Sequence, residues 1–410
     1  MKPMRVGEEL EVEIERIVPG GWGLTHARGE TIMVALAAPQ DRALVRIERA
    51  SSRVRFASIV RLLAPSPARV APRCSFFGRC GGCDFQQLSY EAQLAAKVEI
   101  VRDCLRRIGR LEVADLSIVP SPAQWRYRSR AEWQLNRELG RIGYFMRGSH
   151  EVVEITECPV LAQPLMETLA KLRERDEFHR LPPSVRSIHA LVGDEGSVSL
   201  APSPVAQLVP EWGAQPRAVE RTVAEMIYRF DAECFFQVNE HVLSALVRAA
   251  TDGAGGVLAL DLYSGVGLFT LPLAKRAARV VAVEENLTAC RFARANAQRA
   301  GATNVEVRCA SVLDWLRAAE IAGPVDFVLL DPPRAGLENE TVTHLLRLAP
   351  ARIAYVGCDP AAMARDVRKF VERGYVVRSV SLFDMFPQTH HVETVAQMVR
   401  ERDDSFGRRG

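Results

Sequence analysis

Apolar runs that alternate with helical stretches over residues 233–410 constrain the fold of this 410-residue chain more than any other feature. Four runs read as buried strands, at residues 257–262, 280–283, 325–330 and 353–356. Helical patterns occupy residues 267–276, 286–300, 340–347 and 360–373. Strands that alternate with helices form a doubly wound, mostly parallel sheet. The sequence therefore predicts an α/β protein with a Rossmann-like domain over residues 233–410.

Two further domains are expected before this one. Residues 4–63 carry short apolar strands separated by turns, a pattern typical of an OB-like β-barrel, which is a common RNA-binding platform. A proline-rich linker follows at residues 65–72. Residues 72–232 combine a cysteine-rich loop, a helical pattern and short strands, which predicts a central mixed α+β domain.

Basic residues cluster in one part of the chain. Residues 41–130 hold 17 Lys and Arg against 8 Asp and Glu, whereas the net charge of the whole chain is only +3. Such clustering favours nucleic acid as a partner. No apolar run reaches the roughly 18–20 residues of a membrane span, and the charged N-terminus does not resemble a signal peptide. We therefore expect a cytoplasmic protein with no membrane partner.

Cys358 is placed where a nucleophile could act. It follows the apolar strand 353–357 and precedes Asp359-Pro360, an N-cap residue and a proline suited to a first helical turn. The thiol is expected at a strand-to-helix turn, where the partial positive charge of the helix N-terminus lowers its pKa. From position alone, a buried structural cysteine is the alternative.

The loop after the first strand indicates a cofactor pocket. Gly265 and Gly267 allow the backbone to approach a ligand, and Glu284 ends the next strand, where a carboxylate can accept both ribose hydroxyls. A third glycine for a diphosphate is missing, which favours S-adenosylmethionine over NAD, the alternative. Asp331, in Asp331-Pro332-Pro333-Arg334, would hold a rigid carboxylate over the same cleft. Arg334 could stabilise negative charge there or form a salt bridge.

A second group of cysteines has the spacing of a metal site. Cys74, Cys80 and Cys83 follow a C-x5-C-x2-C pattern, and Cys158 is the best candidate for a fourth ligand. Four thiolates suit either zinc or an iron–sulfur cluster, and the spacing does not decide between them. Nine cysteines make a disulfide framework unexpected. The other four are expected to be core residues: Cys104, Cys234, Cys290 and Cys309.

Together these motifs resemble the RNA uracil-C5-methyltransferase family over nearly the whole chain. Residues 4–63 resemble its TRAM domain, an OB-like RNA-binding module, and the four cysteines resemble its [4Fe-4S] site, which makes zinc the less expected occupant. Phe235-Phe236-Gln237-Val238-Asn239 resembles the entry motif of its catalytic domain. The resemblance implies Cys358 as nucleophile and Glu393, in Thr389-His390-His391-Val392-Glu393, as general base. It implies cofactor contacts by Gln237, Tyr263, Glu284 and Asp331.

The resemblance also implies an activity. A methyl group would pass from S-adenosylmethionine to C5 of a uridine in RNA, through a covalent bond between Cys358 and C6 of the base. The resemblance implies 23S rRNA as the substrate, because the family's ribosomal-RNA members carry the cluster and its tRNA-specific members generally lack it; a tRNA uridine is the alternative. A catalytically inactive RNA-binding or ribosome-assembly protein is the more distant alternative. We expect a monomer.

Overall fold

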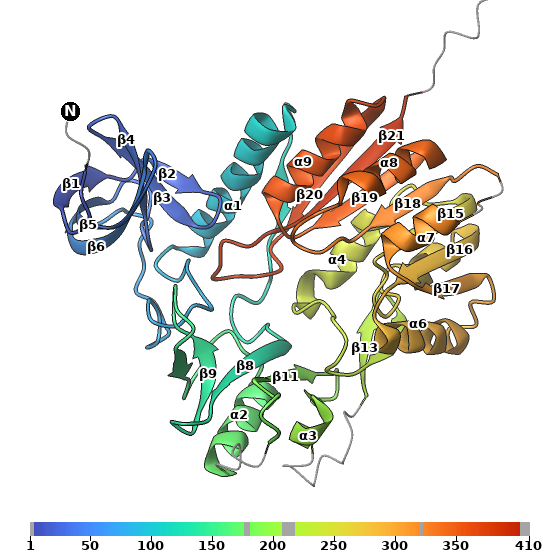
Figure 1. The fold of residues 1–410 in the computed structure, drawn as a ribbon, viewed down its shortest axis with the longest axis horizontal. Coiled ribbons are helices and arrows are strands. Elements are labelled where there is room, and N and C mark those ends of the chain that lie inside the picture. The colour runs from blue at the N-terminus through green and yellow to red at the C-terminus, as the bar shows by residue number, and fades with distance from the viewer. Residues whose placement is uncertain (1–3, 176–180, 207–217, 320, 322, 402–410) are drawn as a thin grey trace, which may run out of the picture.

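An eight-stranded sheet occupies the C-terminal half of the protein in the computed structural model, which describes residues 4–175, 181–206, 218–319, 321 and 323–401 (Figure 1). Its strand order is β17-β16-β15-β18-β19-β21-β20-β7. The strands are β7 (Ser117–Val119), β15 (Gly256–Leu262), β16 (Ala277–Glu284), β17 (Val305–Cys309), β18 (Phe327–Leu330), β19 (Arg352–Gly357), β20 (Tyr375–Phe383) and β21 (Glu393–Arg400). The first five strands of that order are parallel, and β21 is antiparallel to both of its neighbours.

Helices cover both faces of this sheet. They are α4 (Glu240–Ala250), α5 (Thr270–Ala274), α6 (Leu287–Arg299), α7 (Val312–Ala318), α8 (Asn339–Leu348) and α9 (Pro360–Val371). Successive residues of β15 face opposite sides: Ala259 packs in one core, and Leu258 and Leu260 pack in the other. The predicted Rossmann-like, mostly parallel α/β sheet is therefore confirmed.

The sequence patterns missed part of this sheet. The helix predicted at residues 267–276 is only α5, because Gly265 and Gly267 adopt positive φ angles of 54° and 93° and keep the preceding segment a loop. Four strands of this sheet were not predicted: β7, β17, β20 and β21. The last two form the antiparallel pair that carries Glu393.

The N-terminal part is a six-stranded sheet with its own core. The strands are β1 (Glu9–Glu13), β2 (Arg16–Val18), β3 (Trp22–Ala27), β4 (Glu30–Val34), β5 (Arg42–Ser51) and β6 (Val54–Ala64). Their order is β1-β5-β6-β4-β3-β2, and buried side chains such as Ile32, Val34 and Ile47 form the core.

In its described residues, 72–175, 181–206 and 218–232, the middle of the chain contributes a five-stranded sheet, a hairpin and three helices. The strands are β8 (Arg130–Asn136), β9 (Arg141–Phe145), β10 (Val152–Glu154), β11 (Ser187–Val192) and β12 (Val198–Ala201), and the hairpin is β13 (Val219–Val223) with β14 (Met226–Phe230). The helices are α1 (Tyr90–Cys104), which continues as one π-helical turn (Leu105–Gly109), α2 (Gln163–Arg175) and α3 (Ser203–Ala206). No helix within the described ranges is long and apolar enough to cross a membrane.

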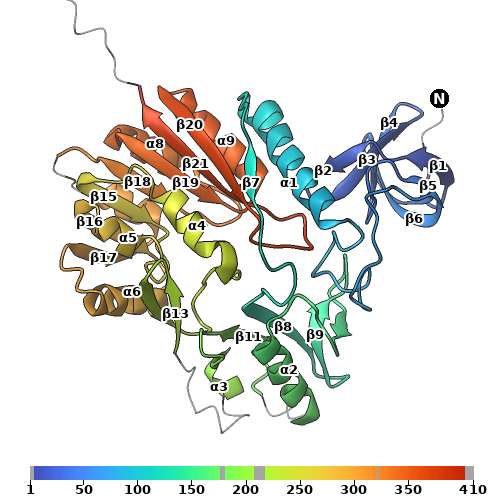
Figure 2. The same ribbon diagram turned by 180° about the vertical axis from the view of Figure 1, so that it is seen from behind.

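Two elements of the middle segment belong spatially to the C-terminal sheet. β7 pairs in parallel with β20 at the sheet edge, and α1 with its π turn packs on α9 (Figure 2). The C-terminal sheet is thus completed by residues that precede it by more than a hundred positions.

Two cysteines differ from their predicted role. The structure joins Cys290 of α6 to Cys309 of β17 by a disulfide. They were expected to be unpaired core residues, because sequence spacing does not show that the helix after β16 returns over the end of β17. Cys104 and Cys234 are buried and unpaired, as predicted.

Candidate active site

One cavity of about 1000 Å³ opens at the carboxyl ends of the parallel strands. It is lined by six residues that the sequence singled out: Gln237, Tyr263, Glu284, Asp331, Cys358 and Glu393. They lie at the ends of β15, β16, β18 and β19, at the start of β21 and just before α4. Ligands of open α/β sheets bind at this edge. The structure therefore brings together all the residues predicted for catalysis and for cofactor binding.

The antiparallel register of β19 and β21 places Cys358 near Glu393. Gly357 pairs with Thr394, whose hydroxyl donates a hydrogen bond of 2.7 Å to the Gly357 carbonyl. Cys358 follows the first of these residues and Glu393 precedes the second, so both lie at the same end of the two strands. The turn after Cys358 forms as predicted: Asp359 caps α9 by accepting a hydrogen bond from the Ala362 amide.

Burial governs the charge state of this pair. Burial raises the pKa of the Glu393 carboxyl well above its usual range, with Asp331 adding to the rise and Arg334 opposing it. Burial also raises the pKa of the Cys358 thiol to about 11; the Glu393 charge adds to this rise, and the positive charge of Arg334 opposes it. The expectation of a lowered pKa for Cys358 is wrong, because desolvation and a neighbouring carboxyl raise it.

We expect alkylation of Cys358 in the free protein to be slow at neutral pH. Only the thiolate reacts, so its rate should rise about tenfold per pH unit between pH 7 and 10. Mass spectrometry of the peptide that contains Cys358, after timed iodoacetamide exposure, measures this rate. A rate that levels off near pH 7 would contradict the raised pKa.

The cofactor loop is tied to the end of β16. Glu284 accepts hydrogen bonds from the backbone amides of Gly265 (2.9 Å) and Asn286 (2.7 Å). Tyr263, at the end of β15, has a φ of 66°, which turns the chain towards these contacts. The carboxylate is thereby fixed at the cavity wall, with lone pairs left to accept further hydrogen bonds.

Several buried polar atoms of residues that line the cavity form no hydrogen bond within the described ranges. The buried side-chain oxygens of Gln237, Ser264 and Thr341 have no hydrogen-bond partner within the described ranges, and all three residues line the cavity. Burial raises the pKa of Asp331 to about 7, with Asp261 and Glu284 adding to the rise. Unpartnered buried oxygens are costly, so the cavity suits a ligand that carries polar groups.

Comparison with known proteins identifies the family. A model described as tRNA (uracil-5-)-methyltransferase matches residues 217–401. A 23S rRNA (uracil(1939)-C(5))-methyltransferase of Alkalilimnicola ehrlichii is 33% identical over 97% of this chain and 98% of its own length. Its counterpart from Shewanella amazonensis is 31% identical over 96% of each chain. The chain belongs to the RNA uracil-C5-methyltransferase family.

A solved structure adds to this assignment. The tRNA (uracil-54, C5)-methyltransferase of Pyrococcus abyssi, in complex with S-adenosyl-L-homocysteine, aligns with a TM-score of 0.73 at 29% identity. The alignment covers 95% of this chain and all of that one. The present protein is thus an S-adenosylmethionine-dependent RNA methyltransferase. The cavity fits that cofactor, since its ribose hydroxyls and amino-acid group can satisfy the unpartnered oxygens.

Glu284 provides a direct test of cofactor binding by the methyltransferase. Glu284→Gln should weaken S-adenosylhomocysteine binding about 10- to 100-fold, because hydrogen bonds to a charged group contribute about 1.5–3 kcal/mol. Isothermal titration calorimetry measures the change. Glu285→Gln is the matched control: this exposed neighbour lines the same cavity but ties down no loop amide. Equal affinities of both variants would exclude Glu284 from the cofactor site.

The four cysteines of the methyltransferase also gather at one place. Cys74, Cys80, Cys83 and Cys158 line a small cavity together with Arg128 and Tyr144, and none of the four forms a disulfide. Within the described residues, however, no group of three or more His, Cys, Asp or Glu side chains is arranged to hold a single metal ion. The structure thus brings the predicted ligands together without a mononuclear site.

Sequence reasoning left some cavity residues unassigned. Arg334 has no ion-pair partner among the described residues, so its contact with Cys358 is the one that the structure supports. Ser264 could have been found from its place in the glycine loop. Thr341 lies inside a helical pattern, which carries no signal of a ligand contact.

Proposed function

We propose that this enzyme methylates C5 of a uridine in 23S rRNA through a covalent adduct between the Cys358 sulfur and C6 of the base. The observation that carries the proposal is the β19–β21 register, which places a thiol and a buried carboxyl side by side in the cofactor cavity. A nucleophile beside a general base at a cofactor cavity suits a reaction that needs both.

The mechanism follows from the weak nucleophilicity of uracil C5. When bound, S-adenosylmethionine supplies an electrophilic methyl group and a positive sulfonium charge, which favours the ionised forms of Cys358 and Glu393. Cys358 loses its proton to water and attacks C6, so that the C5=C6 electron pair forms an enolate. C5 then bonds to the methyl carbon as that carbon leaves its sulfur. The Glu393 carboxylate removes the C5 proton, and the returning electron pair expels the Cys358 thiolate.

Arg334 supports the first step of this mechanism. Its positive charge lies near both groups and lowers the pKa of Cys358 and of Glu393. A fixed positive charge at this point stabilises the thiolate as it forms. The target base must leave its stack to expose C5 and C6 to these groups, which implies a flipped or looped-out uridine.

The choice of 23S rRNA rests on relatives of nearly equal length. Two relatives above 30% identity carry that substrate in their names, whereas the solved relative and the family model name tRNA. A tRNA uridine therefore remains the second candidate, on the strength of the structural alignment. The bases of either RNA would be presented to the same cavity.

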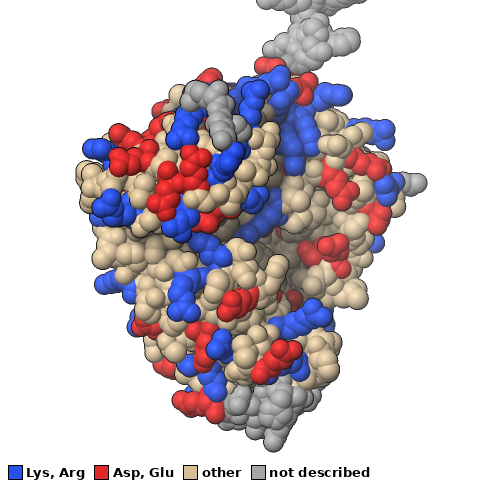
Figure 3. Space-filling model, turned by 60° about the vertical axis from the view of Figure 1, so that its left-hand side comes forward, with Lys and Arg blue, Asp and Glu red and all other residues tan. Residues whose placement is uncertain are grey.

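A basic surface is available for the RNA. On the face shown in Figure 3, Lys and Arg side chains gather along a hollow that crosses the view, with Asp and Glu concentrated on either side. Exposed arginines of the middle and N-terminal segments, such as Arg53, Arg61 and Arg79, contribute to the basic character of residues 41–130. We assign RNA binding to a TRAM-like domain over residues 4–63, an iron–sulfur domain over residues 72–232 and catalysis to residues 233–410.

The cysteine site fits a [4Fe-4S] cluster better than zinc. Burial raises the pKa of Cys80 and Cys158 to about 11 and of Cys83 to about 12, so thiolates need a compensating cation. The preference for the cluster over zinc rests on the resemblance of the Cys74, Cys80, Cys83 and Cys158 pattern to the [4Fe-4S] site of the family. Iron and sulfide in equal amounts, without zinc, is the expected analysis of anaerobically purified protein.

A methyl-transfer assay tests the function. Protein purified with its metal would be incubated with labelled S-adenosylmethionine and total RNA from a strain that lacks this gene. Ribosomal and transfer RNA are then separated, and nucleosides are identified by mass spectrometry. We expect 5-methyluridine in 23S rRNA. Label confined to tRNA would overturn the substrate, and no 5-methyluridine in either pool would favour the inactive RNA-binding protein.

A further inference from the structure

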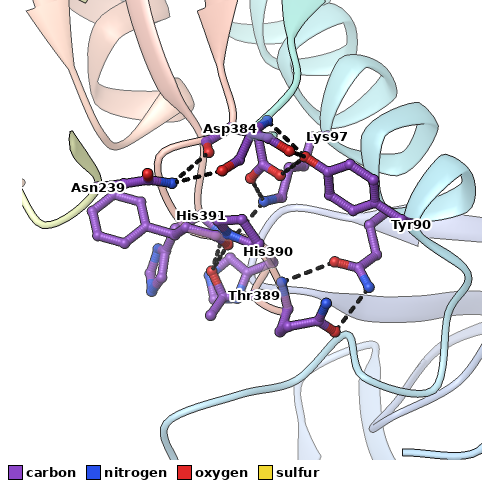
Figure 4. Close-up of polar contacts among 12 residues, drawn as sticks. Tyr90, Lys97, Asn239, Asp384, Thr389, His390 and His391 are labelled. Atoms are coloured by element: carbon purple, nitrogen blue, oxygen red, sulfur yellow. Dashed lines mark hydrogen bonds and ion pairs between the residues drawn. The ribbon is translucent and has the colours of Figure 1, made fainter. Parts of the chain in front are cut away.

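The segment between β20 and β21 is held at its start by a buried ion pair. This β20–β21 loop, residues 384–392, leads directly into Glu393. Lys97 of α1 and Asp384 are both fully buried and form an ion pair, and Lys97 also donates to the Phe386 carbonyl at 3.0 Å (Figure 4). The Tyr90 hydroxyl donates to the second Asp384 oxygen at 2.7 Å. The first residues of the loop are thus anchored to α1.

The end of the same loop is hydrogen-bonded to the cysteine segment, residues 74–87. Asp84, which follows Cys83, accepts a hydrogen bond from the His390 amide at 2.8 Å and contacts the His390 ring nitrogen at 2.5 Å. The amides of Asp84 and Phe85 both donate to the Gln388 carbonyl, at 3.2 and 3.0 Å. Four polar contacts therefore join two residues beside a predicted metal ligand to the last turn before Glu393.

The turn between β2 and β3 packs against the contacts between Asp84 and His390. Gly21, in the turn between β2 and β3, lies so close that an added Cβ would stand 3.0 Å from His390 and 3.1 Å from the Asp84 carboxylate. The Asp84 side chain is only 13% exposed. Water therefore has little access to compete for the pair, which keeps these hydrogen bonds in place.

We propose that Asp84 is a positioning residue that couples the four-cysteine site to Glu393 by clamping the end of the β20–β21 loop. The proposal rests on the proposed function, in which Glu393 removes the C5 proton. Only His391 and Val392 separate the clamped residue from Glu393, and consecutive Cα atoms are 3.8 Å apart. A general base must be held within about 0.5 Å of its productive position, so release of His390 should displace it. The metal site would thereby serve as a fixed point for the base, without electron transfer.

Hydrogen exchange tests the clamp directly. In Asp84→Ala, amides of peptides that cover residues 386–393 should exchange at least about tenfold faster, while peptides of β15 and β16 remain unchanged. Asp84→Asn keeps an oxygen for the His390 amide and should show a smaller effect. Glu157→Ala is the matched control, since Glu157 precedes Cys158 and bonds Ser75 but makes no contact with the loop. Unchanged exchange in Asp84→Ala, or an unfolded Asp84→Ala and Asp84→Asn, would overturn the proposal.

The covalent adduct with RNA provides the functional readout. Asp84→Ala should bind S-adenosylhomocysteine as the wild type does, yet resolve the methylated adduct at least about tenfold more slowly. Iron content, measured in parallel, should match that of Glu157→Ala. If Glu393→Gln accumulates adduct but Asp84→Ala does not, the positioning role is wrong. If neither variant nor the wild type forms adduct, the proposed function fails, and the exchange result still decides whether the clamp exists.

A double variant tests the coupling to the metal site. Cys80→Ser should lose the metal and speed up exchange in residues 386–393 in the same way. Because both changes release one clamp, the Asp84→Ala/Cys80→Ser protein should exchange no faster in this segment than the more affected single variant. Additive effects, or loss of metal with no change in the loop, would separate the two sites and contradict the coupling.

Discussion

Cys358→Ala will abolish both methyl transfer and the covalent complex with RNA. Without the thiolate there is no enolate, and uracil C5 does not attack the methyl group unaided, so turnover should fall by about 10³-fold or more. Methyl incorporation from labelled S-adenosylmethionine measures turnover, and denaturing gels detect the protein–RNA complex.

Two controls separate this loss from misfolding. Cys104→Ala removes another buried thiol, in α1 outside the cavity, and should keep nearly full activity. Cys358→Ala itself should bind S-adenosylhomocysteine as the wild type does, because the thiol is not assigned to the cofactor. Activity of Cys358→Ala within tenfold of the wild type would refute the covalent mechanism.

Glu393→Gln will accumulate the methylated covalent adduct between the enzyme and its RNA substrate. The amide has the shape of the carboxyl but cannot take the C5 proton, so adduct formation and methylation proceed while thiolate release slows by about 10²- to 10⁴-fold. Methyl label should therefore persist in the protein–RNA band of a denaturing gel. Since the ionised Glu393 carboxylate raises the pKa of Cys358, the same substitution should also speed up alkylation of the free thiol at pH values at which Glu393 is ionised.

Glu285→Gln serves again as the comparison, because it removes a carboxylate from the same cavity without touching the Cys358 pair. It should release product normally. A Glu393→Gln enzyme that turns over at the wild-type rate would assign proton removal to another group.

The parallel part of the fold could be predicted because each strand is a continuous apolar run. Residues 257–262, 280–283, 327–330 and 353–356 lie in strands of the eight-stranded sheet, and only Val325 and Asp326 of the predicted runs fall before their strand. The β20–β21 pair was missed because Tyr375–Phe383 mixes arginine and serine with apolar residues, and its partner strand begins at a buried glutamate. Local patterns do not show that Glu393 begins a strand, because its burial depends on the neighbouring β19.

The residues of the candidate site could be predicted from the sequence, but their burial and pKa shifts could not. Motifs at strand ends gave Cys358, Glu284 and Asp331, because parallel strands share one carboxyl edge. The direction of the Cys358 pKa shift could not be predicted, since it depends on burial and on a carboxyl that tertiary packing brings near. Lys97 looked like an ordinary lysine of an amphipathic helix, and only the folded chain reveals that it is fully buried against Asp384.

The strand β7 has a consequence for how the protein can be made. Ile118 of β7 pairs with Leu382 of β20 at the edge of the sheet. During synthesis β7 therefore emerges from the ribosome long before β20, the strand with which it pairs. Until the two strands pair, β20 would present unpaired backbone groups, which invite association with other chains. Excision of residues 233–401 as a separate fragment would leave that edge permanently open and Asp384 without its lysine. Residues 90–119 and the C-terminal sheet are therefore expected to fold together as one unit.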